Sequence, residues 1–317
     1  MTHAAPERLP LRVHALRRIA ETIIELDLRG EGRAPAPIEA GAHLDLHLPG
    51  GLIRSYSLTN PGDASGRYVL AVALDAASRG GSAYIHARLR PGDTLQASGP
   101  RNHFPLAPGA APSLLIAGGI GITPIWAMIQ RLAAEQRDWR LLYAVRSRAR
   151  AAYLDILLQR YPDRLSLHVD EEAGGAADLA GFLRTAPADA QLYCCGPAPM
   201  LDAFESATAD RQPSHVHLER FKGGGDVAAG GFTVIAAASG GSHFVAEGST
   251  ILDTLLDAGL DIPHSCADGI CGTCATRVIE GIPDHRDTLL SAEEREANKK
   301  MLICVSGCKS GRLVLDL

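Results

Sequence analysis

The sequence predicts a multidomain protein in which an antiparallel β-barrel, an α/β domain with a parallel sheet and a small α+β domain follow one another. Short apolar runs, separated by turn residues about every ten positions, fill the first third of the 317-residue chain, as in a barrel or sandwich. From Pro112 onward, strand-like and helix-like runs alternate, which indicates βαβ units. A glycine-rich stretch then precedes a last segment that contains five of the seven cysteines.

Domain boundaries follow from these changes of pattern. Strict alternation in AHLDLHL predicts a barrel strand, and SLLIAGG followed by PIWAMIQRLAAEQ predicts a buried strand and a helix. The stretch KGGGDVAAGG has five glycines in ten residues, which is typical of a flexible linker. We therefore expect a barrel at 1–107, an α/β domain at 108–221, a linker at 222–231 and an α+β domain at 232–317.

Composition and charge argue against a membrane-spanning, secreted or nucleic-acid-binding protein. Apolar residues make up 46% and charged residues 21% of the chain, as in folded soluble proteins. No apolar run reaches the roughly 18 residues of a membrane span, and the N-terminus lacks a signal-peptide pattern, so we expect a cytoplasmic monomer without a membrane partner. The net charge of −5 argues against nucleic-acid binding. Residues 232–317 hold 12 acidic and 7 basic residues, whereas the rest of the chain is balanced.

The cysteines of the last domain have the spacing of metal ligands. Cys266, Cys271 and Cys274 form C-x4-C-x2-C, and Cys304 follows after 29 residues, which is the plant-type [2Fe-2S] pattern. A four-cysteine zinc site is the alternative, but it usually has two closely spaced cysteine pairs, and this chain has one. Cys308 is a second candidate for the fourth ligand. Cys304 is preferred because it lies in the apolar run MLICV, where a buried ligand is expected.

The resemblance extends beyond the spacing. The segments HSCADGICGTCATRVIEG and MLICVSGC resemble the C-terminal ferredoxin domain of reductases of the phthalate dioxygenase reductase and vanillate O-demethylase reductase type. That domain has a β-grasp-like α+β fold. The resemblance therefore implies that residues 232–317 are a plant-type ferredoxin domain with four cysteine ligands.

Two motifs in the predicted barrel can hold a flavin, although an ordinary edge strand could contain the first. RSYSLTN offers an arginine for the phosphate, an aromatic face for the ring and a polar group for its N5 and O4 edge, and RGGSAYIH could begin a helix that binds an anion. In the ferredoxin reductase-like family, these motifs hold flavin and phosphate, and an aromatic residue before the linker contacts the ring. The resemblance implies FMN, rather than FAD, bound by Arg54, Tyr56, Ser57, Ala71, Val72, Arg79, Gly80, Gly81, Ser82 and Phe221.

Two further motifs indicate a nicotinamide nucleotide. AGGIGITPI follows a predicted strand and precedes a helix, so that its glycines admit a pyrophosphate and Pro124 fits the first helical position. YCCGPAPM ends another strand at the same edge of the sheet. The resemblance implies that Cys195 orients the nicotinamide and that Thr123 lies by the flavin, which makes them the predicted catalytic residues. The predicted nucleotide-binding residues are Gly118, Gly119, Gly121, Thr123, Pro124, Arg146, Cys195, Gly196 and Pro197.

The choice between NADH and NADPH depends on the segment after the strand LLYAV. An acidic residue there favours NADH, and arginines favour the 2′-phosphate of NADPH. This chain has Arg146, Ser147, Arg148 and Arg150. Relatives of the phthalate dioxygenase reductase type mostly use NADH, and some carry Arg-Ser here, so NADH is preferred and NADPH remains the alternative.

Together these motifs predict an oxidoreductase that transfers electrons from NADH through FMN and a [2Fe-2S] cluster. A hydride carries two electrons and the cluster accepts one, so that a flavin must lie between them. The resemblance implies that the acceptor is a Rieske-type oxygenase or demethylase that acts on aromatic compounds. A cytochrome P450 acceptor is the near alternative, and a flavin and iron-sulfur redox sensor without turnover is the alternative of another class.

Overall fold

The computed structural model forms two compact units, one that ends at Glu219 and one that begins at Arg220. No helix in the part of the chain that the structure describes is long and apolar enough to cross a membrane. The described residues are 8–30, 37–76, 78, 80–221 and 228–317.

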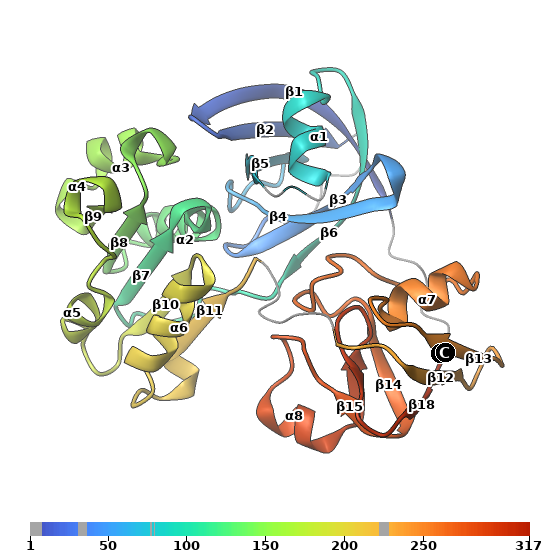
Figure 1. The fold of residues 1–317 in the computed structure, drawn as a ribbon. Coiled ribbons are helices and arrows are strands. Elements are labelled where there is room, and N and C mark those ends of the chain that lie inside the picture. Colours follow the sequence, from blue (N-terminus) through green and yellow to red (C-terminus); the bar gives the residue numbers. More distant parts are fainter. Residues whose placement is uncertain (1–7, 31–36, 77, 79, 222–227) are drawn as a thin grey trace. The chain divides into compact units, whose positions relative to one another are not determined.

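The first sheet has six antiparallel strands in the order β4-β3-β6-β1-β2-β5 (Figure 1). Leu58, which follows β4, forms an isolated bridge with Leu70 in β5, so that the two edges of the sheet meet and the predicted barrel is closed. The elements are β1 (Leu9–Ala20), β2 (Ile23–Gly30), β3 (Ala42–Leu48), the 3-10 turn η1 (Pro49–Gly51), β4 (Leu52–Ser57), β5 (Arg67–Ala73), α1 (Gly81–Ala87) and β6 (Thr94–Asn102).

The second sheet has five parallel strands in the order β11-β10-β7-β8-β9, which confirms the predicted α/β fold. All six residues of β7 are buried, as expected for a central strand covered by helices on both faces. The elements are β7 (Ser113–Gly118), η2 (Gly119–Gly121), α2 (Ile122–Ala134), β8 (Trp139–Val145), η3 (Arg148–Arg150), α3 (Leu154–Arg160), η4 (Pro162–Arg164), β9 (Leu165–Val169), α4 (Asp170–Ala173), α5 (Leu179–Arg184), β10 (Gln191–Cys195), α6 (Ala198–Ala207), η5 (Pro213–His215) and β11 (Val216–Glu219).

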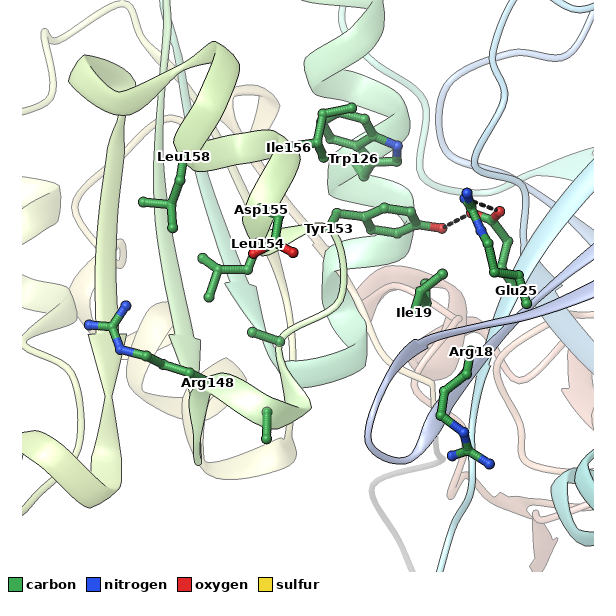
Figure 2. A pocket seen from close by; sticks show the side chains of 13 residues that line it. Arg18, Ile19, Glu25, Trp126, Arg148, Tyr153, Leu154, Asp155, Ile156 and Leu158 are labelled. Carbon is green, nitrogen blue, oxygen red and sulfur yellow. Dashed lines mark hydrogen bonds and ion pairs between the residues drawn. The ribbon is translucent and has the colours of Figure 1, made fainter.

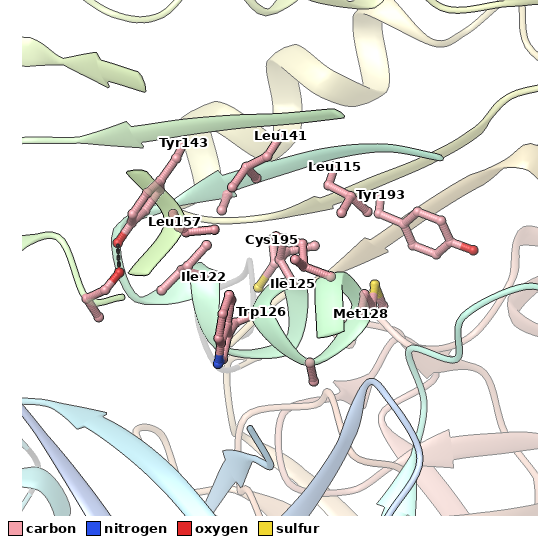
Figure 3. Packing of buried hydrophobic residues seen from close by; sticks show 14 of the residues in the cluster. Leu115, Ile122, Ile125, Trp126, Met128, Leu141, Tyr143, Leu157, Tyr193 and Cys195 are labelled. Carbon is pink, nitrogen blue, oxygen red and sulfur yellow. Dashed lines mark hydrogen bonds between the residues drawn. The ribbon is translucent and has the colours of Figure 1, made fainter. Parts of the chain in front are cut away.

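The barrel and the parallel sheet share a hydrophobic core. Helix α2 lies between them, and its Trp126 packs in one cluster with Tyr143 of the sheet (Figure 3). The same cluster includes Ile23 and Ala71 of the barrel. The side-chain amide of Gln130 in α2 donates a hydrogen bond of 2.7 Å to a barrel carbonyl. The predicted boundary at 107/108 lies inside this unit, between β6 and β7.

The second unit contains a mixed five-stranded sheet in the order β13-β12-β18-β14-β16. Strands β12 and β18 are parallel and the other pairs antiparallel, which agrees with the predicted α+β, β-grasp-like fold. A capping box formed by Ser291 and Glu294 begins α8, a helix that the sequence analysis did not predict. The elements are β12 (Phe232–Ala236), β13 (Ser242–Val245), α7 (Ile251–Asp257), β14 (Ala275–Glu280), β15 (Pro283–Asp284), α8 (Ala292–Ala297), β16 (Lys300–Leu302), β17 (Gly307–Cys308) and β18 (Arg312–Leu315).

Candidate functional site

Four buried thiols gather in the second unit, and they are the four predicted from the sequence. Cys266 shares a hydrogen bond with Cys271, and Cys274 shares one with Cys304. Electrostatic contacts between Cys271 and Cys274 and between Cys266 and Cys304 connect these two pairs. A [2Fe-2S] centre takes two thiolates on each of its irons. Two pairs of buried thiols therefore fit such a centre.

Backbone amides surround these sulfur atoms. The N–H of Asp268 donates to the sulfur of Cys266 at 3.3 Å, and the N–H of Cys266 lies 3.5 Å from the sulfur of Cys271. The loop can turn its amides inward because Gly269 and Gly272 have positive φ angles of 71° and 72°. Hydrogen bonds of this kind stabilise thiolates and tune an iron-sulfur centre, so the loop fits the cluster beyond its cysteine spacing.

The pKa values of the thiols differ within each pair. The hydrogen bond from Cys266 lowers the pKa of Cys271 to about 5, and the bond to Cys271 raises the pKa of Cys266. In the second pair, the pKa of Cys274 is lowered and that of Cys304 is raised, mainly by their mutual hydrogen bond. One thiol of each pair is thus favoured as the thiolate that metal binding requires.

Cys308, the alternative fourth ligand, has different neighbours. Its sulfur lies 3.4 Å from the hydroxyl of Ser310, and the residue is half-buried. Cys304 is 2% exposed and interacts with two of the other thiols. The geometry therefore supports Cys304.

The two glycine motifs of the first unit interlock at the carboxyl edge of the parallel sheet. A Cβ atom on Gly121 would lie 2.1 Å from the carbonyl oxygen of Cys195, and one on Gly118 would lie 2.6 Å from Cδ of Pro197. Gly196 is equally restricted, because a Cβ there would lie 2.7 Å from the sulfur of Met200. The structure thus brings together two motifs that are about 70 residues apart in the chain, at the edge where open α/β sheets bind ligands.

The start of α2 differs from the prediction in one detail. The motif passes through the 3-10 turn that contains Gly119 before α2 begins at Ile122, so that Pro124 is the third helical residue and not the first. The backbone N–H groups of the whole first turn lack partners within the helix, and proline is therefore tolerated there as well. Thr123 is buried and donates a hydrogen bond of 3.0 Å to the carbonyl of Ile120.

Adjacent cysteines at the end of β10 face opposite sides of the sheet. Cys195 packs in the cluster that contains α2, as Figure 3 shows, and Cys194 packs in the cluster that contains α5 and α6. Burial raises the pKa of the Cys195 thiol. A buried neutral thiol can orient a ligand, but it is a poor nucleophile.

Glu219 is a residue of this edge that the sequence analysis missed. It ends β11 and is paired with Cys195 in the strand register. Its Oε2 atom is buried and has no hydrogen-bond partner among the described residues, and burial raises its pKa to about 8. The only indication in the sequence was a charged residue at the end of a short strand.

The two flavin motifs of the barrel come together. Gly81 begins α1, and a Cβ atom there would lie 2.7 Å from Cγ of Arg54 in β4. Gly80 is the preceding N-cap, with a φ of 93°. The hydroxyl of Ser82 lies 3.0 Å from that of Ser78 and accepts a hydrogen bond from the backbone of Asp75.

The other predicted flavin residues lie on neighbouring elements or elsewhere. Ser57 ends β4, and Ala71 and Val72 lie in β5, all buried. Burial raises the pKa of Tyr56 to about 12, so that the phenol keeps its proton. Phe221 belongs to the second unit, where it is 36% exposed, and its contact with a flavin stays a prediction. Arg79 lies outside the described residues.

The arginines after β8 already have acidic partners. Arg146 lies 3.6 Å from Glu171, and Arg148 makes two contacts of 2.7 and 3.1 Å with Glu172. Both glutamates come from α4, the turn that follows the next strand. A 2′-phosphate would have to compete with these carboxylates.

A pocket of about 830 Å³ lies between the barrel and α3. In Figure 2, the ring of Tyr153 stacks on that of Trp126 and its hydroxyl donates a hydrogen bond to Glu25. Arg18 and Arg148 also line it. Its lining includes none of the predicted site residues.

Two family models match the chain. Residues 115–206 match the oxidoreductase NAD-binding domain, and residues 238–309 match the 2Fe-2S iron-sulfur cluster binding domain. These matches agree with the predicted order of the nicotinamide and ferredoxin domains.

Similar proteins cover nearly the whole chain. "Phenoxybenzoate dioxygenase subunit beta" from Ectopseudomonas oleovorans is 47% identical over 309 residues, which cover 97% of both chains. The solved structure of phthalate dioxygenase reductase, described as modular for electron transfer from pyridine nucleotides to [2Fe-2S], is 35% identical, with a TM-score of 0.79 and 98% of both chains covered. An intact type IV self-sufficient cytochrome P450 monooxygenase is 36% identical with a TM-score of 0.83, and the chain covers 41% of its length.

Serine variants of Cys304 and Cys308 should show which of the two is the fourth ligand of the cluster. We expect Cys304→Ser to lose the visible absorption of the cluster, because serine replaces a buried thiolate, whereas Cys308→Ser keeps it. Absorption and EPR spectra of the purified variants measure this. The opposite pattern would assign the fourth ligand to Cys308.

Glu219 should make stability depend on pH. Its folded pKa of about 8 exceeds the usual value of 4.5, so the folded state retains a proton that the unfolded chain releases. Stability should therefore fall as the pH rises from about 4.5 to 8. Between pH 6 and pH 8.5 this fall should be roughly 1–3 kcal/mol, and we expect Glu219→Gln to remove it.

Urea unfolding at pH 6 and pH 8.5 measures this difference. Tryptophan fluorescence reports the first unit, because it contains both tryptophans, Trp126 and Trp139. The control is Asp163→Asn, on an exposed turn, which should keep the wild-type dependence. Equal pH dependence in wild type and Glu219→Gln would mean that Glu219 ionises normally in the folded protein.

Proposed function

Because the chain belongs to the phthalate dioxygenase reductase family, we propose that it is the reductase component of a Rieske-type aromatic-ring oxygenase or demethylase. It is an oxidoreductase that passes electrons from NADH through FMN to a [2Fe-2S] cluster. The acceptor and the site residues are the parts that we propose. None of the seven cysteines, all of which are described, forms a disulfide bond, which supports a location in the reducing cytoplasm. We propose that the protein acts there as a monomer.

One observation carries the proposal. A single chain holds both a pair of interlocked glycine motifs at a sheet edge and two pairs of buried thiols, three of which lie in an amide-lined loop. The first suits a nucleotide and the second suits a one-electron centre. Bound together, the cofactors would supply redox chemistry in which two electrons arrive as a hydride and leave singly.

The residues around the nicotinamide would hold and orient it. Gly118 and Gly121 allow the two motifs to pack against each other, and the space beside Gly119 is open, where a pyrophosphate would lie. The buried thiol of Cys195 would fix the position of the ring. Thr123 has its hydroxyl already bonded to a backbone carbonyl, so it would act by keeping the start of α2 in place beside the flavin.

The residues of the barrel would hold FMN. Gly81 leaves room for the side chain of Arg54, so a phosphate near the start of α1 would meet the guanidinium of that arginine. Ala71 and Val72 would lie along the ring, and Tyr56 would cover it as a neutral phenol.

The nucleotide preference is supported by the glutamates of α4. Glu171 and Glu172 already interact with the arginines that would otherwise attract the 2′-phosphate of NADPH. Exposed ion pairs are weak, about 0–1 kcal/mol, so these glutamates would disfavour NADPH only slightly.

Two observations support an oxygenase as the electron acceptor: how much of each similar protein the chain matches, and the negative charge of residues 232–317. The match covers 97% of the dioxygenase relative and 98% of the phthalate dioxygenase reductase structure, but only 41% of the longer P450 monooxygenase chain. A separate oxygenase component is therefore favoured. The acidity of residues 232–317 supports docking on a basic surface of that partner.

Anaerobic stopped-flow with NADH tests the electron path. We expect the flavin absorbance to bleach first and the cluster absorbance to follow, because the hydride enters at the flavin. Diode-array spectra separate the two steps. A cluster that stays oxidised while the flavin is reduced at a turnover-compatible rate would refute the path, and failure of NADH to reduce either would refute the reductase function.

Variants of the arginines test the nucleotide preference. We expect Arg146→Asp and Arg148→Asp to change the kcat/KM for NADPH by less than about threefold, because their guanidinium groups already face Glu171 and Glu172. Steady-state reduction of an artificial acceptor with each nucleotide measures the effect. A loss of tenfold or more with NADPH alone would show that the arginines bind its 2′-phosphate.

A further inference from the structure

A charged cluster is formed by residues that lie between Cys274 and Cys304 in the sequence. The side chain of Asp287 is completely buried, 3.7 Å from Nδ1 of His285 and 3.8 Å from the guanidinium of Arg295. Arg295 also donates a hydrogen bond to the backbone carbonyl of Asp287. The side chain of His285 is also largely buried, at 9% exposed, whereas that of Arg295 is 39% exposed. Neither the domain family nor the proposed electron path explains why a carboxylate and a histidine are buried here.

Asp287 shapes the turn that follows it. Its Oδ2 atom accepts hydrogen bonds from the backbone N–H groups of Leu289 at 3.2 Å and Leu290 at 2.8 Å. Leu290 is buried in the core, and Leu289 contacts the cysteine loop, where a Cβ on Gly272 would lie 2.7 Å from it. Gly272 stands between two of the thiols, so this leucine covers part of the cluster-binding loop.

The same segment contacts the loop at a second place. The N–H of Thr288 donates to the carbonyl of Gly269 at 3.1 Å, and a Cβ on Gly269 would lie 3.1 Å from Cα of Asp287. The N–H of Gly269 in turn interacts with the sulfur of Cys304. The N–H of Arg286 donates to the hydroxyl of Ser306 at 3.2 Å. Residues 286–289 therefore connect the cysteine loop to the chain around the fourth thiol.

The charged cluster is incompletely satisfied. Both ring nitrogens of His285, Oδ1 of Asp287 and Nε of Arg295 are buried without a hydrogen-bond partner among the described residues. Leaving such a group unpaired costs about 1–3 kcal/mol, and an apolar cluster of the same shape would avoid that cost. Buried groups that stay unpaired at this cost call for an explanation other than stability.

We propose that Asp287 and Arg295 are positioning residues for the [2Fe-2S] centre: they hold residues 286–290 against the cysteine loop, and their opposed charges set its reduction potential. The inference rests on the proposed function, because it requires that the four thiols hold the cluster. Net charge, hydrogen bonds to the sulfurs and exposure to solvent are the terms that tune such a centre. This ion pair acts on all three.

The two halves of the ion pair have effects of opposite sign. Reduction adds one negative charge to the centre. Asp287→Asn leaves the Arg295 cation unopposed, stabilises the reduced form and raises the potential, whereas Arg295→Gln leaves a carboxylate and lowers it. Loss of structure alone would admit water in both variants and move both potentials upward, since water stabilises the more highly charged form.

Redox titration of the full-length holoprotein, followed by the EPR signal of the reduced cluster, tests the proposal. We expect each substitution to change the reduction equilibrium by about tenfold or more, about 59 mV for one electron, with opposite signs. Shifts in the same direction, or no shift in either, would overturn the proposal. The matched control is the exposed ion pair of Glu280 and Arg312, 2.7 Å apart, whose Gln variants should leave the potential unchanged.

Leu289→Ala provides a test that alters no charge, should Asp287→Asn fail to retain the cluster. It uncovers the Gly272 side of the loop, and we expect a higher potential and a changed EPR line shape. An unchanged potential and spectrum would overturn the positioning role of the segment. Wild-type protein without a reduced-cluster signal would instead refute the proposed function, and reduction of the flavin by NADH, measured in parallel, separates these failures.

Discussion

Four buried thiols must be held close together by a loop that has few side chains of its own, and the second unit follows from that constraint. The loop turns its amides toward sulfur at Gly269 and Gly272, where positive φ angles exclude most other residues. Packing contacts that stabilise the loop therefore come from other segments of the unit. Leu289 and the turn held by Asp287 pack against both glycines, and Cys304 arrives from a separate strand region.

The first unit applies the same principle to a nucleotide. Close backbone approach requires glycine, and Gly121 lies so near the carbonyl of Cys195 that two motifs far apart in sequence become one surface. The shared core around Trp126 fixes α2 against both the barrel and the sheet. The flavin and nicotinamide residues are therefore positioned by one packed body, as efficient hydride transfer requires.

The sequence was sufficient for what depends on local pattern and spacing. Short alternating runs between turns predicted the barrel, and the alternation of strands with helices predicted the parallel sheet. Cysteine spacing identified the four thiols that lie together. Contacts between distant segments could not be anticipated: the partner of Arg146 on α4, the unpartnered Glu219 beside Cys195, and the burial of Asp287. Pro124 was misplaced by two helical positions because a 3-10 turn, which has no distinct sequence signature, precedes α2.

One chain takes up two electrons as a hydride and releases them one at a time. Anaerobic titration with NADH, followed by absorbance and EPR, measures how many electrons each chain accepts. We expect about three, two on the flavin and one on the cluster, and therefore an endpoint of about 1.5 NADH per chain. An endpoint at about one NADH, with a cluster that reduces only on addition of dithionite, would contradict this account.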